Sequence, residues 1–257
     1  MILEIIKDEL LDSFRKAIKT SPLQTLAKNQ DPNLPVDYFT FYHSVSSVYS
    51  SKIEGENIDF DSFYKHKFLN VTYNTDYTQR SNDLFTAYEF IVKNRLTFPH
   101  LQKAHCLLSA HLLPENQQGK IRNNPMFVIN SDDKIEYIAA APLLVATELE
   151  KLFNDIQLLL NAELDEFECF YFASWVHLVF VKIHPFQDGN GRSARLLEKW
   201  FLMEKFGEKA VSIPLEKNYF MHINDYYLNI KKIGNDYQTL NYAKSLDFLL
   251  MTVLGLK

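Results

Sequence analysis

The run Cys169–Val181 contains no charged residue and is flanked by Glu168 and Lys182. It is too short to span a bilayer, which takes about 20 apolar residues. The wider segment 165–183 is apolar nearly all round, a pattern typical of a helix buried on every side. We therefore predict a central helix over 165–183. A chain of 257 residues can bury one such core with an appended subdomain.

Periodicity along the rest of the chain predicts a mainly α protein. One stretch differs, because MFVIN and KIEYI over 126–138 alternate and turn as a β-hairpin does. Gly55 and Gly207 follow two of the expected helices, as C-terminal glycines commonly do. We expect helices at 3–19, 37–54, 79–95, 99–113, 142–160, 165–183, 192–206, 216–232 and 239–254.

Composition excludes several classes of protein. The formal net charge of −5 argues against a general nucleic-acid binder, which carries a basic excess. Cys106 and Cys169 are the only cysteines and form no CxxC pair, so we expect neither a zinc site nor a disulfide framework. Acidic residues interrupt the apolar N-terminus MILEIIKDELLDSF, which is unlike a signal peptide. We therefore expect a cytoplasmic protein without a membrane partner.

The segment HPFQDGNGRSAR at 184–195 contains two of the chain's seven glycines. Pro185 ends the preceding helix at His184, and a histidine fixed there can act as a general base near neutral pH. Asp188 offers the hard oxygen ligand that magnesium prefers beside polyphosphates. Phe186 is a structural anchor for the loop. Alone, the histidine would more often be a packing or capping residue, so its surroundings decide the interpretation.

Those surroundings favour a phosphate site. Gly189 and Gly191 permit backbone conformations that turn amide N–H groups toward one point. The next helix begins there, and its N-terminus favours an anion. Arg192 and Arg195 are three residues apart, so both guanidinium groups leave one helix face, as phosphate oxygens require. We predict a nucleoside triphosphate with a divalent metal as the ligand.

Two other loop types fail on spacing. With Gly191 at the sixth position of an EF-hand loop, positions one and twelve are Phe186 and Leu197, where calcium requires carboxylates. A Walker A loop needs GxxxxGK followed by Ser or Thr, which the chain lacks. A plain turn remains the structural alternative for DGNG.

The twelve residues resemble the Fic family motif HxFx(D/E)GNGRxxR at every defined position. The resemblance extends over the helical frame from about residue 45 to 235, including the hairpin. It implies a Fic-type helical bundle with a hairpin flap, and transfer of AMP from ATP to a Ser, Thr or Tyr hydroxyl of a protein. On that pattern 76–257 is the catalytic core with C-terminal helices.

The resemblance also implies roles for single residues. His184 is the base that deprotonates the target hydroxyl, and Asp188 holds Mg²⁺ (or Mn²⁺) on the phosphates. The loop Gly189, Asn190 and Gly191 binds the phosphates through its amides. Arg192 and Arg195 bind the β- and γ-phosphates. This assignment agrees with the chemistry of the residue types, because phosphoryl-type transfer mainly needs positioned groups and charge stabilisation.

A second segment, SSVYSSKIEGEN at 46–57, looks like an ordinary helix ending with a solvated glutamate. Ser50 and Glu54 are four residues apart and share a helix face. With Gly55 they match the Fic inhibitory motif (S/T)xxxE(G/N), so 1–75 resembles an N-terminal segment that carries an inhibitory helix. The resemblance implies that Glu54 pairs with Arg195 and withholds it from the γ-phosphate.

The hairpin region 119–138 resembles the flap on which a Fic target docks by strand pairing, although a structural hairpin is the simpler alternative. Tyr226, Tyr227 and Asn235 fall where the family often contacts adenine, although aromatic core packing explains the tyrosines nearly as well. The expected partners are ATP and a protein target of unknown identity, and self-modification and a homodimer stay open.

Three alternatives to a self-inhibited adenylyltransferase also stay open. A hydrolase that removes AMP from modified proteins would use Glu54 to position water. A Fic-type transferase could use another nucleotide or transfer a phosphoryl group. A nucleotide-binding regulator without catalysis would not need His184 and Asp188.

Overall fold

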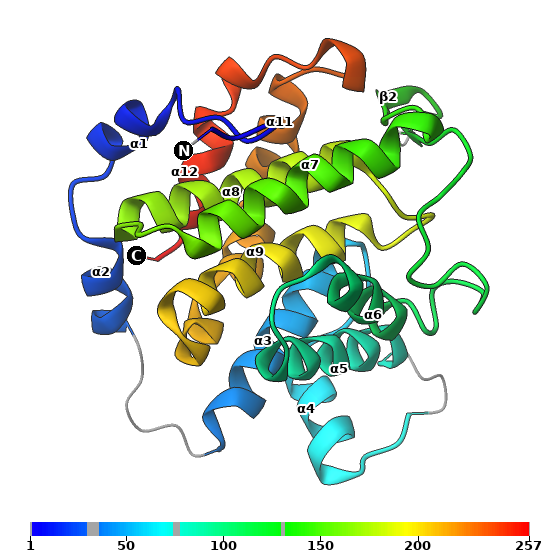
Figure 1. Ribbon diagram of the computed structural model, residues 1–257. Helices are drawn as coiled ribbons and strands as arrows, with labels where there is room; N and C mark the ends of the chain where they lie inside the picture. Colours follow the sequence, from blue (N-terminus) through cyan, green and yellow to red (C-terminus); the bar gives the residue numbers. More distant parts are fainter. Residues whose placement is uncertain (1, 30–35, 74–77, 130–131, 257) are drawn as a thin grey trace.

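The computed structural model describes residues 2–29, 36–73, 78–129 and 132–256. The fold is mainly α with one two-stranded antiparallel hairpin, as predicted (Figure 1). The α-helices are α1 Leu11–Ala17, α2 Pro22–Asn29, α3 Tyr38–Ile53, α4 Phe60–Leu69, α5 Gln79–Lys93, α6 Phe98–Leu108, α7 Pro142–Asn161, α8 Glu166–Ile183, α9 Asn190–Phe206, α10 Leu215–Met221, α11 Ile223–Lys232 and α12 Leu246–Leu254. Short 3₁₀ turns are η1 Glu208–Ser212, η2 Tyr237–Thr239 and η3 Tyr242–Lys244.

Helix α8 lies at the centre, as its apolar sequence predicts. Nearly every residue of α8 is buried, and its neighbours are α9, α7 and α12 (Figure 1). A capping box starts the helix, because the Asp165 side chain accepts the Glu168 N–H and the Glu168 side chain accepts the Asp165 N–H. Within the described ranges, no helix is both long enough and apolar enough to cross a bilayer.

The antiparallel hairpin comprises β1 Phe127–Ile129 and β2 Ile135–Ile138, with Phe127 opposite Ile138. Its predicted span of 126–138 is confirmed, and Asn130 and Ser131 at its tip lie outside the described residues. Ile138 also donates its N–H to the Asn235 carbonyl at 2.9 Å. The hairpin is thereby attached to the segment that follows α11.

The prediction of a helix over 3–19 is wrong at its N-terminal half, since α1 covers only Leu11–Ala17. The reason is a tertiary contact. Buried Asp155 on α7 accepts the backbone N–H groups of Glu4, Ile5 and Ile6 at 2.7, 2.8 and 2.8 Å. These groups therefore bond to a distant carboxylate, which replaces the helical pattern that local periodicity favours.

Other boundaries also differ from the sequence prediction. Helix α2 begins at Pro22, which occupies a helix N-terminus where its missing N–H costs nothing. Helix α4 was not expected, and α6 ends at Leu108 rather than 113. The expected helix 216–232 is divided at His222 into α10 and α11, and only 246–254 of the last expected helix is α-helical.

Candidate active site

His184 lies at the C-terminus of α8 in a left-handed conformation, with φ 56° and ψ 60°. Its N–H still donates to Phe180, and its Nδ1 lies 3.1 Å from the Val181 carbonyl oxygen. A carbonyl can only accept, so Nδ1 carries the proton and Nε2 keeps its lone pair. Burial lowers the pKa of His184, against the opposing effect of Val181. The imidazole is therefore neutral near pH 7, as a general base must be.

The loop after His184 is held together by its own side chains. Asn190 accepts the Phe186 N–H at 2.8 Å and donates to the Phe186 carbonyl at 2.9 Å. Gly189 has φ 73°, a conformation that other residues rarely adopt. Phe186 is fully buried, at the place where the sequence analysis expects an anchor for the loop. Asn190 thus shapes the predicted anion-binding loop through its side chain.

A histidine that the sequence analysis did not identify supports this loop from α6. His105 stacks on Phe186, donates from Nε2 to the Asp188 carbonyl at 2.9 Å, and accepts the Gly119 N–H on Nδ1 at 2.8 Å. Burial lowers the pKa of His105 to about 4, so the ring stays neutral and keeps one donor and one acceptor. No local signal marks His105, because its partners are remote in sequence.

Arg122 connects the hairpin to the same loop. Its guanidinium is buried and donates to the carbonyls of His184 at 2.7 Å, Asn124 at 2.7 Å and Ala140 at 2.6 Å. The base of the predicted flap is therefore fixed to the end of α8 through backbone oxygens. Gly119 and Arg122, at the start of the hairpin region 119–138, thus contact the support of the motif and the motif itself.

Arg195 is bound by the helix that carries the predicted inhibitory motif. It donates to Ser50 Oγ at 2.9 Å, to the Ser50 carbonyl at 3.2 Å and to Glu54 Oε1 at 2.6 Å. Burial alone would raise the pKa of Glu54, but the charges of Arg195 and Arg192 outweigh it and the pKa is lowered. The structure thus brings Glu54 onto the arginine that the sequence analysis paired with it, and Ser50 of the same motif binds that arginine too.

Gly191 makes room for this ion pair. A Cβ atom built on Gly191 would lie 2.5 Å from Glu54 Oε1 and 3.2 Å from Arg195 Nη1. Gly55, with φ 84°, ends α3 immediately after Glu54, as predicted. The Glu54 carboxylate therefore lies against the first turn of α9, where the helix dipole favours an anion.

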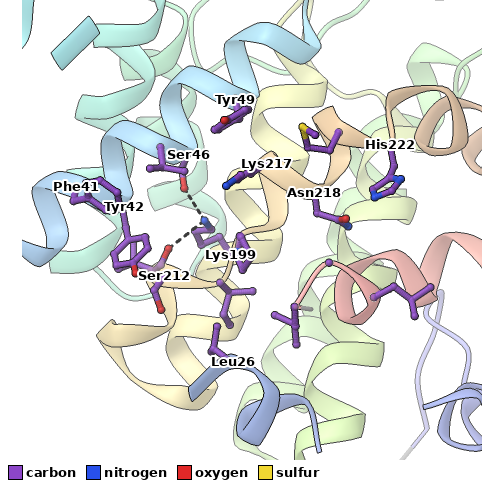
Figure 2. Close-up of a pocket in the computed structure, with 18 of the residues that line it drawn as sticks. Leu26, Phe41, Tyr42, Ser46, Tyr49, Lys199, Ser212, Lys217, Asn218 and His222 are labelled. Carbon is purple, nitrogen blue, oxygen red and sulfur yellow. Dashed lines mark hydrogen bonds between the residues drawn. The ribbon is translucent and has the colours of Figure 1, made fainter. Parts of the chain in front are cut away.

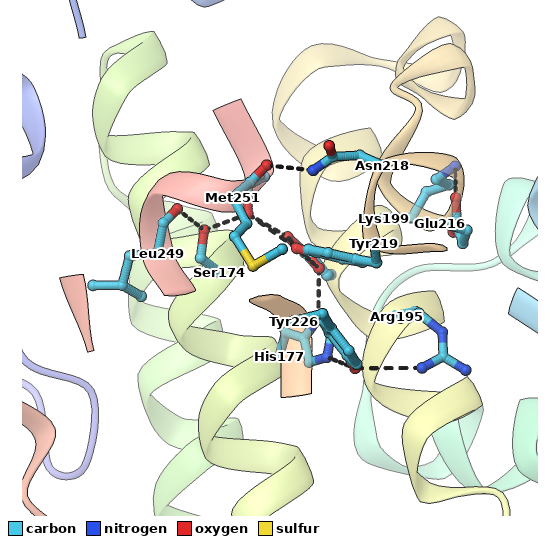
Figure 3. Close-up of polar contacts among 12 residues, drawn as sticks. Ser174, His177, Arg195, Lys199, Glu216, Asn218, Tyr219, Tyr226, Leu249 and Met251 are labelled. Atoms are coloured by element: carbon cyan, nitrogen blue, oxygen red, sulfur yellow. Dashed lines mark hydrogen bonds and ion pairs between the residues drawn. The ribbon is translucent and has the colours of Figure 1, made fainter. Parts of the chain in front are cut away.

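A buried polar chain fixes Arg195 from the other side (Figure 3). Arg195 donates to the Tyr226 hydroxyl at 3.3 Å, and that hydroxyl lies 3.0 Å from His177 Nε2. His177 Nδ1 lies 2.6 Å from Glu198, which also accepts from Tyr219. Every member is buried. With Tyr226 donating to Nε2 and Nδ1 donating to Glu198, each hydrogen bond has one donor and one acceptor. Sequence reasoning identified Tyr226 but not His177 or Glu198.

Arg195 and Tyr226 line a cavity of about 280 Å³. It is lined by the following residues: Glu54, Val128, Glu136, Tyr137, Val181, Lys182, His184, Gly191, Arg195, Tyr226, Tyr227, Ile230, Lys231 and Gly234. The predicted base, inhibitory glutamate and arginine therefore face one space beside the hairpin. Tyr227 lines it and donates to the Ile53 carbonyl at 3.1 Å, whereas Asn235 is not among the lining residues. The adenine contacts stay a prediction.

A larger cavity of about 820 Å³ lies against a different part of α3 (Figure 2). Tyr42, Ser46 and Tyr49 line it, and none of residues 184–195 does. At its floor Lys199 donates to Ser46 at 2.6 Å and to Glu216 at 2.7 Å. The smaller cavity, which Glu54, His184 and Arg195 line, is the one whose side chains suit nucleotide chemistry.

Asp188 fits the predicted metal in its chemistry. Its side chain is exposed beside the loop, and Oδ1 accepts the Gly189 N–H at 2.6 Å. Magnesium beside a polyphosphate is commonly held by one or two carboxylates together with phosphate oxygens and waters. Across the described part of the chain, no group of three or more His, Cys, Asp or Glu side chains is arranged to hold a metal. A single carboxylate suits an ion that arrives with its nucleotide.

The motif at 184–195 lies within a segment that matches a known family. Residues 95–202 match a family model described as "Fic/DOC family". The chain is 30% identical to "Protein adenylyltransferase Fic" of Nematostella vectensis over 133 residues, which are 50% of this chain and 28% of that protein. The match therefore spans little more than a quarter of the relative's length.

The fold resembles several solved structures. A Fic family protein from Desulfovibrio desulfuricans G20 has a TM-score of 0.76 and 16% identity, covering 100% of this chain and 74% of that chain. A Fic domain containing signaling protein from Bacteroides thetaiotaomicron VPI-5482 has a TM-score of 0.68 and 16% identity, covering 96% and 92%. Fic-1 from C. elegans has a TM-score of 0.61 and 15% identity, covering 96% and 66%. At these identities the likeness concerns the fold alone.

Proposed function

Because this chain belongs to the Fic/DOC family through its residues 95–202, we propose that it is a self-inhibited protein adenylyltransferase. It would transfer AMP from ATP to a Ser, Thr or Tyr hydroxyl of a target protein or of itself. The observation that carries the proposal is the 2.6 Å pair between Glu54 and Arg195, in the cavity that His184 lines. The name of the Nematostella relative supports the same activity.

In the proposed reaction, the target hydroxyl oxygen attacks the α-phosphorus of ATP. The bond from that phosphorus to the departing pyrophosphate breaks, and the hydroxyl proton passes to Nε2 of His184. Val181 fixes the tautomer that leaves Nε2 able to accept this proton. Amides at the start of α9 and the two arginines bind phosphate oxygens. A magnesium or manganese ion at Asp188 would supply charge neutralisation on the phosphates.

Inhibition follows from the place of Glu54. While it accepts from Arg195, that guanidinium is withheld from the γ-phosphate, and productive ATP binding must displace the carboxylate. Charge-assisted hydrogen bonds contribute about 1.5–3 kcal/mol. Because the Glu54 side chain is 29% exposed, solvent screens the pair and the lower part of that range applies. The productive ATP pose is then disfavoured by roughly tenfold or more.

The hairpin is the proposed docking site for the target. Its apolar side chains are unusually open to solvent, with exposed fractions of 48% for Phe127, 51% for Ile129, 57% for Ile135 and 45% for Ile138. An extended target segment that pairs with a strand would cover them and bring its hydroxyl toward the adjacent cavity.

Purified wild-type protein and Glu54→Gly, each incubated with magnesium and ATP labelled at the α- or γ-phosphate, test the reaction class. We expect protein-bound label from the α position only, with much more in Glu54→Gly than in wild type. Protein-bound label from the γ position would indicate a phosphotransferase and overturn the proposal. ATP binding without any label transfer in either protein would indicate a non-catalytic regulator.

A hydrolase that removes AMP from proteins is the second candidate. The position of Glu54 favours this candidate. Its charge acts on His184 within the same cavity, and its carboxylate could orient a water molecule there. The discriminating experiment supplies an AMP-modified protein made with the Glu54→Gly variant. Removal of AMP by wild type but not by Glu54→Gly supports the hydrolase, and persistence of the label supports the transferase.

A further inference from the structure

A second glutamate, Glu56, binds two arginines beside the inhibitory helix. Glu56 follows Gly55, and its Oε1 atom accepts from Arg80 Nη1 at 2.7 Å and from Arg192 Nη2 at 3.1 Å. Arg80 belongs to α5 and Arg192 to the first turn of α9. One carboxylate oxygen thus joins two guanidinium groups that come from elements far apart in sequence.

Burial decreases from Arg192 through Glu56 to Arg80. Arg192 is 4% exposed, Glu56 20% and Arg80 46%. Arg192 Nε is buried and has no hydrogen-bond partner among the described residues. A buried guanidinium with an unused donor is costly unless an anion satisfies it. The Glu56 contact therefore leaves the donor set of Arg192 incomplete, and a ligand with several acceptor oxygens could complete it.

The location of the cluster indicates which anion this is. The charges of Glu54, Glu56 and Asp188 all act on Arg192, and the charge of Asp188 acts on Arg80. Arg192 also follows Gly191, which lines the proposed nucleotide cavity, so the cluster lies beside that site and near both the inhibitory glutamate and the proposed metal ligand. A carboxylate held by two guanidinium groups occupies the position that a phosphate would take there.

We propose that Arg80 joins Arg192, whose phosphate role the motif already implies, in a subsite for the terminal phosphates of the nucleotide, and that Glu56 occupies this subsite until the nucleotide displaces it. Arg80 is then a nucleotide-binding residue that lies outside the family motif, and Glu56 is a second carboxylate that competes with ATP. The proposal rests on the proposed function, because it takes a nucleoside triphosphate as the ligand.

The first test compares ligands with and without terminal phosphates. Calorimetry on the full chain would measure binding of α,β-methylene-ATP, which cannot transfer AMP, and of AMP. Arg80→Ala should weaken binding of the triphosphate by roughly tenfold, the value of one charge-assisted contact, and leave AMP binding unchanged. Arg80→Lys should fall between, since it keeps the charge without the bidentate fork. Lys93→Ala, on the same helix, is the matched control and should bind like wild type.

A purely structural Arg80 would give a different result. If Arg80 only anchored the end of α3 to α5, Arg80→Ala would lower the thermal midpoint and change triphosphate and AMP affinity alike, or change neither. Either outcome would overturn the proposal, because the predicted signature is a loss specific to the terminal phosphates.

The second test concerns Glu56. Glu56→Gln keeps the shape but removes the charge, so it should raise triphosphate affinity several-fold and leave AMP affinity unchanged. In a Glu54→Gly background, Glu56→Gln should raise triphosphate affinity further, because the two carboxylates bind different arginines. No gain in either background would contradict the proposal. If Glu54→Gly itself fails to release AMP transfer, the proposed inhibition fails, and the triphosphate-specific effect of Arg80 still decides the subsite.

Discussion

At the residue scale, the motif at 184–195 determines much of its own structure. Pro185 follows the end of α8, Gly189 adopts the left-handed conformation, and Asn190 closes the loop on Phe186. The helix end and the unusual glycine conformation depend on short-range chemistry and were predicted from the sequence, whereas the contact between Asn190 and Phe186 was not. The residues that support the loop from elsewhere, such as His105, were not predicted, because no local pattern marks a side chain whose partner is remote along the chain.

Replacing His184 tests its role as the base. In a Glu54→Gly background, His184→Ala should reduce AMP transfer by about 10²–10⁴-fold, the usual effect of losing a general base. ATP affinity should change little, because the imidazole accepts a proton and binds no phosphate in this account. His222→Ala, outside the site cavity, serves as the control. Near-normal transfer by the His184 variant would remove it from the mechanism.

Replacing Asp188 tests the metal assignment. Asp188→Asn is made in a Glu54→Gly background. It keeps the shape and the oxygen that can accept the Gly189 N–H, but it removes the charge that a divalent cation requires. Transfer measured against magnesium concentration should shift to at least tenfold higher magnesium, about the effect of losing one charge-assisted contact. The thermal midpoint without magnesium should stay close to that of Glu54→Gly alone. An unchanged magnesium dependence would contradict the assignment.

At the element scale, α3 was predicted within one residue at either end, and its Glu54–Arg195 contact came from a motif rather than from periodicity. Its buried face is rich in serine and includes His43, which hydropathy alone would place in solvent. The prediction of a helix over 3–19 was wrong because a tertiary contact overrides a clear local pattern. Its periodicity was clear, but the Asp155 carboxylate binds the backbone of residues 4–6 more favourably than a helix would.

A histidine on α3 should make the stability of the fold sensitive to acid. His43 packs against Phe85 and Tyr88, and its buried Nε2 has no hydrogen-bond partner in the described part of the chain. Burial, with help from the charge of Lys199, lowers the pKa of His43 to about 4. Between pH 6.5 and 4 the unfolded chain therefore binds a proton that the folded chain does not. Stability is fully present above pH 6.5 and falls as the pH approaches 4, by about 3 kcal/mol from this group.

Chemical denaturation of wild type and His43→Phe at several pH values measures this contribution. Phenylalanine fills the aromatic site without titrating. The variant should be about as stable as wild type at pH 7 and should lose less stability between pH 6.5 and 4. Parallel curves for the two proteins over that range would show that His43 is not the titrating group.

At the scale of the whole molecule, the predicted helical bundle with one hairpin is confirmed, and the apolar segment 165–183 correctly identified its central helix. The assembly of the site was only partly predictable. Motifs paired Glu54 with Arg195, whereas the Glu56–Arg80–Arg192 cluster and the His177–Glu198 pair arise from packing of α3, α5 and α8 around α9. Such pairs depend on three-dimensional register between helices, which periodicity within each helix does not specify.

The most direct test of the account is the initial rate of AMP incorporation from α-labelled ATP by wild type and Glu54→Gly at equal concentration. Glu115→Gly, which removes an exposed acid from a turn outside the cavity, is the matched control. Freeing Arg195 should raise the Glu54→Gly rate roughly tenfold or more above wild type, while the control stays at the wild-type rate. Equal, low rates for all three proteins, with ATP bound equally by each, would contradict the claim that Glu54 suppresses the proposed AMP transfer.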